Sequence, residues 1–198
     1  FNLFPKVSII IVTHNNLEYT SLCLESIVKN TEYPNYEIII VDKGSNNETV
    51  IYLDEFRMRN KKVSLLLNNS SLEFKTAITQ GFHESRGKYI VLLHYDTIVT
   101  SGWIYRLLFH FKKNPSAGMI GPVTNACDNE AKINITYTNL DEINTFSAHR
   151  AIEFEGKAFT IKVLGLYCCM TLREYFEDIM GLEEQSKLDR FDEEYLAR

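Results

Sequence analysis

The chain has 198 residues, of which 45% are hydrophobic and 24% are charged, and its formal net charge is −5. This length and composition are ordinary for one globular domain with a full core, and the negative charge argues against nucleic acid as a general partner. No apolar run reaches the roughly 18 residues needed to cross a membrane, and the stretch 1–6 is too short for a signal peptide.

The four cysteines predict no metal site. They are Cys23, Cys127, Cys168 and Cys169, and none forms the CxxC-type pair that structural zinc sites use. We interpret them as buried, reduced thiols, which are typical of cytosolic proteins. The expected location is therefore cytoplasmic, with peripheral contact at the inner face of the membrane left open.

The first half of the chain alternates short apolar runs with helical patterns. We predict strands over residues 7–13, 37–41, 63–67 and 89–93, with helices over about 17–29, from 45 to about 59, and from 70 to about 85. Capping-box spacing is found for Asn15 with Glu18, Ser45 with Glu48, and Ser70 with Glu73. Strands that alternate with helices are typical of parallel βαβ units.

The pattern is less regular after residue 96. We expect a helix near 102–111, a short strand at 119–122, a polar loop over 125–146, a strand at 160–170 and a helix at 172–179. The last segment, FDEEYLAR, is acidic and then helical in pattern. A regular nucleotide-binding half followed by a variable substrate half would explain this asymmetry.

Polar residues follow three of the buried strands. Thr13, His14 and Asn15 end the first strand or follow it, Asp42 follows the second, and the triplet 94–96 (HYD) follows the fourth. Open α/β sheets bind ligands beyond the carboxyl ends of their strands. We therefore expect these side chains to open into one cleft.

Position alone leaves two interpretations for each carboxylate. Asp42 could bond a base or a ribose, or it could close the turn before Gly44. Asp96 could ligate a divalent cation that bridges phosphates, or it could cap a turn. Asp192, in an acidic triplet, could act in catalysis or could simply favour the start of a helix.

The motifs together resemble the family 2 glycosyltransferases with the GT-A fold. The resemblance rests on VSIIIVTHNNLEYTSLCLESIVKNT, YEIIIVDKGSNNET, GKYIVLLHYDTIVTSGWI, GPVTNACDNEAK, VLGLYCCMTLREYFEDIMGL and FDEEYLAR, which occur in the family's order. It covers nearly the whole chain and is greatest for bacterial members that build surface polysaccharides. It implies a three-layer α/β/α sandwich with a mostly parallel sheet over residues 1–198, as one module of a longer protein. A nucleotide-binding half would span about 1–98 and an acceptor half about 99–198.

The resemblance also implies roles for individual residues. Asp96 matches the last aspartate of the family's DxD-type motif, which binds Mn²⁺ or Mg²⁺ on the donor diphosphate. Asp192 matches the catalytic base of inverting members, and Glu193 competes for that role because the register is uncertain by one. The implied nucleotide-binding residues are Thr13, His14, Asn15, Asp42, His94 and Tyr95.

Several positions depart from the family pattern. His94 replaces the first carboxylate of the DxD-type motif, and Lys43 follows Asp42 where Asn or Asp is usual. Glu73 stands near a usual glycine, and Thr79 lies where the family carries an Arg-Asn or Asn-Asn pair.

We therefore retain two hypotheses. The first is an inverting, metal-dependent transferase that moves a sugar from a nucleotide sugar, expected to be a UDP-sugar, to a hydroxyl of a glycan, lipid-linked or protein acceptor. The second is a non-catalytic GT-A module that binds or supports other domains of the same protein. A nucleotidyltransferase is disfavoured, because the loop THNNLEY lacks the glycine-rich, basic character that holds a triphosphate.

Overall fold

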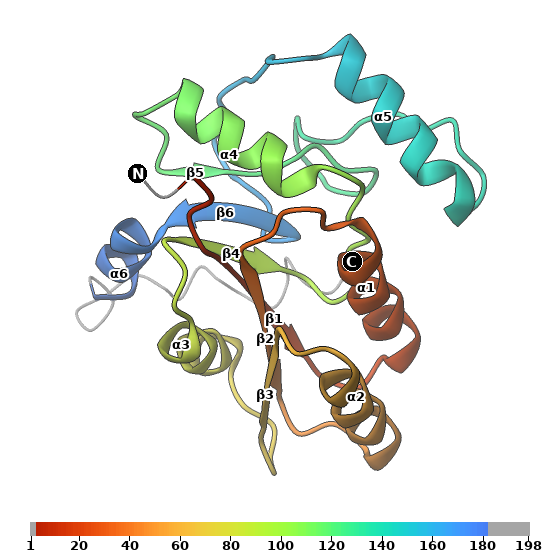
Figure 1. Ribbon diagram of the computed structural model, residues 1–198, viewed down its shortest axis with the longest axis vertical. Helices are drawn as coiled ribbons and strands as arrows, with labels where there is room; N and C mark the ends of the chain where they lie inside the picture. Colours follow the sequence, from red (N-terminus) through yellow and green to blue (C-terminus); the bar gives the residue numbers. More distant parts are fainter. Residues whose placement is uncertain (1–2, 182–198) are drawn as a thin grey trace.

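The computed structural model describes residues 3–181 (Figure 1). The first half contains β1 (Val7–Thr13), α1 (Leu17–Asn30), β2 (Tyr36–Asp42), α2 (Asn47–Arg59), β3 (Val63–Leu67), α3 (Phe74–Glu84) and β4 (Tyr89–Leu93). The second half contains α4 (Trp103–Lys113), β5 (Met119–Ile120), the 3₁₀ helix η1 (Leu140–Glu142), α5 (Ile143–Glu153), β6 (Cys168–Leu172) and α6 (Arg173–Gly181).

The strands of the described residues form one sheet in the order β3-β2-β1-β4-β6-β5. β3, β2, β1 and β4 are parallel neighbours, which confirms the prediction from the sequence. β6 is antiparallel to both β4 and β5. β1 lies between β2 and β4, so the residues that follow these three strands emerge side by side.

The sheet is covered on both faces, which confirms the three-layer architecture (Figure 1). Alternate residues of β1 face opposite layers: Ile9 and Ile11 pack with α1, α2 and α4, whereas Ile10 and Val12 pack with α3 and α6. Every residue of β1 is buried. Burial on both faces explains why the strand sequence VSIIIVT is almost continuously apolar rather than alternating.

The second half corrects two expectations. The predicted strand over 160–170 is in fact β6, which begins at Cys168, where pairing with Leu93 of β4 starts. The predicted loop over 125–146 contains η1 and the first turn of α5. α5 has no buried residue, so its sequence lacks the apolar periodicity that predicts a helix.

The predicted helix caps are also wrong. α1 follows Asn16, which is left-handed and makes no side-chain cap, and α3 follows Glu73, which makes none either. α2 is capped by Asn46, whose side chain accepts a hydrogen bond from the backbone N–H of Thr49. In the part of the chain that the structure describes, no helix has the length and apolarity to span a bilayer.

Candidate active site

The carboxyl ends of β1, β2 and β3 are joined by hydrogen bonds. Thr13 and Asp42 are register partners, and the N–H of Lys43 donates to the carbonyl of Thr13 at 2.8 Å. The side-chain amide of Asn68, which follows β3, donates to the carbonyl of Asp42 at 2.8 Å. The loops after these strands therefore start from fixed positions.

Asn15 joins the loop after β1 to the loop after β2. Its N–H donates to the Ser45 hydroxyl at 2.7 Å, and its side-chain oxygen accepts from the N–H of Asn46 at 2.8 Å. Asn15 and Asn16 have positive φ values of 54° and 49°. Asparagine tolerates this left-handed region better than most residues, which explains the Asn-Asn pair at this tight turn.

Asn16 joins the same loop to the end of β4. Its side-chain amide donates to the Tyr95 hydroxyl at 2.9 Å. The predicted residues from three strands are thus brought together at one end of the sheet. Asn16, Ser45 and Asn68 were not predicted from the sequence as residues of the site. The adjacent asparagines are a usable signal for Asn16, but the bonds that join Ser45 to Asn15 and Asn68 to Asp42 span 30 and 26 residues.

The side chains of Thr13 and Asp42 point into the protein. The Thr13 hydroxyl lies 2.9 Å from that of Thr20. Asp42 is fully buried, and its carboxylate accepts from the N–H groups of Gly44 and Ser45 at 3.0 and 2.9 Å and from the Ser45 hydroxyl. Asp42 therefore closes its own turn, the alternative that its sequence position had left open.

His94 and Asp96 form a close pair. The His94 Nδ1 lies 2.5 Å from the Asp96 Oδ1. An ionised carboxylate can only accept a hydrogen bond, so this contact places a proton on Nδ1. The His94 side chain is 7% exposed and that of Asp96 is 40% exposed. The Asp96 carboxylate therefore faces solvent, and the buried His94 ring contacts it from the protein interior.

The backbone around this pair is anchored by a segment distant in sequence. The N–H of His94 donates to the carbonyl of Tyr167 at 2.9 Å, and the Thr97 hydroxyl donates to the same carbonyl at 3.0 Å. The His94 ring lies 4.4 Å from the Tyr95 ring, centroid to centroid. Tyr167, just before β6, thus fixes the turn that carries Asp96, a role that no local sequence pattern indicated.

Cys23 of α1 lies behind the same turn. Its thiol is 3.6 Å from the His94 carbonyl, and burial together with the Asp96 charge raises the thiol pKa. Cys168 and Cys169 are buried as well, and all four cysteines are free, as expected. Cys127 was predicted to be buried, but it is only half-buried. Thiols with raised pKa values are poor nucleophiles and poor metal ligands.

The Nδ1 of His14 is buried and has no hydrogen-bond partner among the described residues. Its Nε2 lies 3.3 Å from the side-chain nitrogen of Asn15. A buried polar atom without a partner is uncommon in a folded protein and is often explained by a ligand or water. His14 therefore has a free bonding position beside the loop after β1.

Asp192 and Glu193 lie outside the described residues, so the geometry of the predicted base stays a prediction. Glu73 is exposed at the N-terminus of α3. Within residues 3–181, no group of three or more His, Cys, Asp or Glu side chains is arranged to hold a metal alone. One exposed carboxylate at this end of the sheet can still hold a cation whose remaining ligands are phosphates and water.

The chain matches the sequence model of glycosyl transferase family 2 over residues 8–180. It is 29% identical over 117 residues to an uncharacterized glycosyltransferase of Haemophilus influenzae, covering 59% of this chain and 36% of that protein. It is 28% identical over 116 residues to the poly-beta-1,6-N-acetyl-D-glucosamine synthase of Staphylococcus epidermidis, covering 58% of this chain and 27% of the synthase. The chain therefore spans well under half the length of these relatives.

The fold is similar to that of the mannosyltransferase PcManGT from Pyrobaculum calidifontis, solved in complex with GDP-Man and Mn²⁺. The TM-score is 0.67 at 16% sequence identity, and the match covers 90% of this chain and 47% of that protein. At this identity the likeness shows a shared fold.

Proposed function

The chain belongs to glycosyl transferase family 2, and we propose that it transfers a sugar with inversion from a nucleotide sugar, a UDP-sugar, to a hydroxyl acceptor. The acceptor is a glycan, lipid-linked or protein group in glycan or polysaccharide synthesis. The observation that carries this proposal is the Asp96 carboxylate, exposed at the end of β4 beside the joined loops after β1 and β2.

The donor nucleotide is proposed to lie against Thr13, His14, Asn15 and Asp42. The buried, unpartnered Nδ1 of His14 supports this position, because it lacks the partner that a base or a ribose would supply. Asp42 contributes chiefly by holding the turn at Gly44 and Ser45, since both of its oxygens already accept hydrogen bonds. His94 and Tyr95 complete the proposed set at the end of β4.

Asp96 would hold the divalent cation, Mn²⁺ or Mg²⁺. The donor set fits such an ion, because hard cations on phosphates use one or two carboxylates and keep several waters. The cation would supply positive charge where the diphosphate leaves with developing negative charge. His94 orients the Asp96 carboxylate through Nδ1 and acts as a positioning residue in this arrangement.

Asp192 is proposed as the general base, with Glu193 as the alternative at the adjacent position. A carboxylate within hydrogen-bond reach of the acceptor hydroxyl can take its proton as the oxygen attacks the anomeric carbon. Attack from the face opposite the diphosphate forms the new glycosidic bond as the old bond breaks. This single displacement inverts the anomeric centre and needs no nucleophile from the protein.

A second function is favoured by the departures from the family pattern. His94 replaces an expected carboxylate and so removes one negative charge. Glu73 adds a negative charge close to where the diphosphate would lie. Under this alternative the chain binds or supports other domains of a longer protein without turnover.

Calorimetric titration with UDP and with GDP, each with Mn²⁺, tests the proposal. We include GDP because the structurally similar mannosyltransferase binds GDP-Man. We expect UDP to bind the wild type, Asp96→Asn to lose the metal-dependent part, and UDP-sugars to be turned over. Binding without turnover of any UDP-sugar favours the second function. Failure of both nucleotides to bind contradicts the proposed donor site.

A further inference from the structure

A surface on the second half of the chain combines aromatic and cationic side chains. It is formed by Phe109, Lys113, Arg150, Phe154, Lys157 and Phe159, and we call it the basic–aromatic surface. It lies over the end of α4 and the segment that leads from α5 to β6. All six residues belong to the half of the chain that does not carry the proposed donor site.

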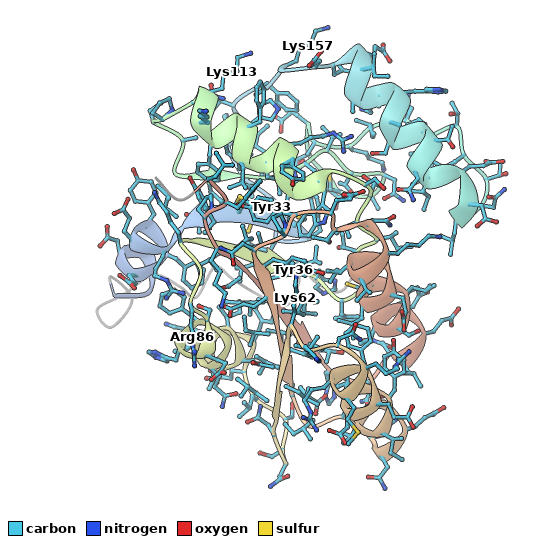
Figure 2. The ribbon with its side chains drawn as sticks, viewed as in Figure 1. Tyr33, Tyr36, Lys62, Arg86, Lys113 and Lys157 are labelled. Carbon is cyan, nitrogen blue, oxygen red and sulfur yellow. The ribbon has the colours of Figure 1, made fainter. Side chains whose placement is uncertain are left out.

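Direct contacts connect the other five residues of this surface, and Phe159 follows two positions after Lys157. The Lys113 amine donates to the carbonyl of Gly156 at 2.9 Å, which ties α4 to the segment after α5. The Arg150 guanidinium and the Lys157 amine lie 4.2 and 5.0 Å from the centre of the Phe154 ring. Figure 2 shows Lys113 and Lys157 close together at the top of the molecule.

The apolar side chains here are exposed and are not needed for the core. Phe159 is 60% exposed and Phe109 is 49% exposed. α5 contributes no buried residue, and it lies at the periphery, away from the sheet (Figure 1). Exposed apolar groups gathered in one place mark an interaction site more often than scattered ones do.

The charge of this surface is opposite to that of the whole chain. The segments that form this surface contain only two acidic residues, Glu153 and Glu155. The same segments contain five basic residues, which are Lys112, Lys113, Arg150, Lys157 and Lys162. The chain as a whole has a net charge of −5. A local excess of cations on an acidic protein directs this one face toward an anionic partner.

We propose that the basic–aromatic surface docks the protein on an anionic lipid bilayer. Lysine and arginine stems can lie along apolar groups while their charged ends reach lipid phosphates. Phenylalanine rings between them can enter the boundary between headgroups and acyl chains. Each of the two contributions is weak, and their combination gives the reversible binding of a peripheral membrane protein.

Nucleic acid is a poorer match for this surface. Binding of a duplex depends chiefly on phosphates that are neutralised by cations, and its stacked bases offer the exposed rings of Phe109 and Phe159 no apolar layer to enter. A lipid surface uses the cations and the aromatic rings together, so it accounts for more of the surface.

Vesicle co-sedimentation of the 198-residue chain tests the proposal. The vesicles are either pure phosphatidylcholine or an equimolar mixture of phosphatidylcholine and phosphatidylglycerol. The charge variant is Lys113→Gln with Lys157→Gln, since glutamine removes the positive charge and keeps an N–H donor on a side chain that is one atom shorter. Its matched control is Lys29→Gln with Lys61→Gln, which removes the same charge from the exposed last turn of α1 and the exposed turn after α2.

The apolar variant is Phe159→Ser. Its control is Ile51→Ser on α2, because Ile51 is 59% exposed, close to the 60% of Phe159. A circular dichroism spectrum of each variant shows whether it is folded. Sedimentation velocity without vesicles reports self-association.

We expect binding to the anionic vesicles only, and high salt should remove it. Each neutralised lysine should weaken binding about fivefold and the pair about twenty-fivefold, whereas the control pair stays within about twofold of wild type. Equal binding to both vesicles, no binding by wild type, or equal loss in the charge variant and its control overturns the proposal. The proposal is also overturned if the wild type does not bind vesicles but forms a dimer that Phe159→Ser dissociates, because the surface is then a protein interface. Binding is measured without any sugar donor, so the result is separate from that of the proposed transferase activity.

Discussion

Replacing Asp42 by alanine should cost about 3 kcal/mol in the free energy of unfolding. The fully buried Asp42 carboxylate accepts three hydrogen bonds, from the N–H groups of Gly44 and Ser45 and from the Ser45 hydroxyl. A net loss of about 1 kcal/mol per bond gives this sum. For a chain of this size, that loss lowers Tm by about 6–12 °C.

Urea unfolding followed by circular dichroism measures the loss, and two further variants calibrate it. Asp42→Asn keeps one acceptor oxygen but presents an amide to the remaining donors, so its stability should fall between those of alanine and wild type. Asp54→Ala is the matched control. Asp54 is a half-exposed aspartate paired with Arg57 on the surface of α2, and such pairs contribute under about 1 kcal/mol.

A loss for Asp42→Ala that equals the loss for Asp54→Ala would refute this reasoning, because the three hydrogen bonds would then contribute nothing net. Titration of UDP into each folded variant separates the two roles proposed for Asp42. If Asp42 only shapes the turn, the UDP affinity of Asp42→Asn should fall only as far as its stability falls. If Asp42 bonds the ribose, UDP affinity should fall further than stability does.

Three further predictions concern metal binding, the turn after β2, and catalysis. Asp96→Asn should abolish Mn²⁺-dependent UDP binding, and His94→Gln should weaken it less, since it disturbs only the orientation of Asp96; equal loss in both would make His94 a direct ligand. Gly44→Ala should lower the free energy of unfolding by about 1–3 kcal/mol, because φ is +86° and the added Cβ would lie 2.7 Å from backbone. Gly118→Ala, where a Cβ meets nothing within 4 Å, should stay within about 0.5 kcal/mol of wild type, and similar unfolding curves for the two variants would contradict the steric argument. Asp192→Asn should lower the transfer rate at least about 10²-fold with UDP binding intact, and full turnover by this variant would show that Asp192 is not the base.

The central strands could be predicted from the sequence because both of their faces are buried. β1 and β4 occupy 7–13 and 89–93, as the apolar runs indicated. A parallel strand between two helical layers needs apolar side chains on both faces, so its bounds coincide with the apolar run. β6 also lies in an apolar run, but that run begins earlier, because residues such as Leu164 and Leu166 pack against the core without pairing.

The caps could not be predicted, because contacts between loops decide them. Asn15 has the spacing of a capping residue for α1, yet its side chain accepts from the N–H of Asn46 in the next loop. Asn46 caps α2 in place of the predicted Ser45, whose hydroxyl donates to Asp42. A local pattern cannot report that a better partner is supplied from thirty residues away.

The same limit applies to the candidate site. The sequence placed Thr13, His14, Asp42 and Asp96 at one end of the sheet, because strand direction determines where each strand ends. It could not give the direction of each side chain. Thr13 and Asp42 turn inward, Asp96 faces solvent, and only the packing around each residue distinguishes these cases.

His94 gives a physical reason why the missing first carboxylate need not remove a cation site. Two carboxylates two residues apart repel one another when no cation is present, whereas an imidazole Nδ1–H attracts and orients the remaining one. The 2.5 Å contact fixes Asp96 through a residue that is itself held by the carbonyl of Tyr167. A carboxylate fixed in advance loses less conformational freedom when it takes up an ion, which offsets part of the lost charge. The ion would then depend more on the donor's phosphates for its other ligands, so metal and nucleotide binding become more strongly coupled.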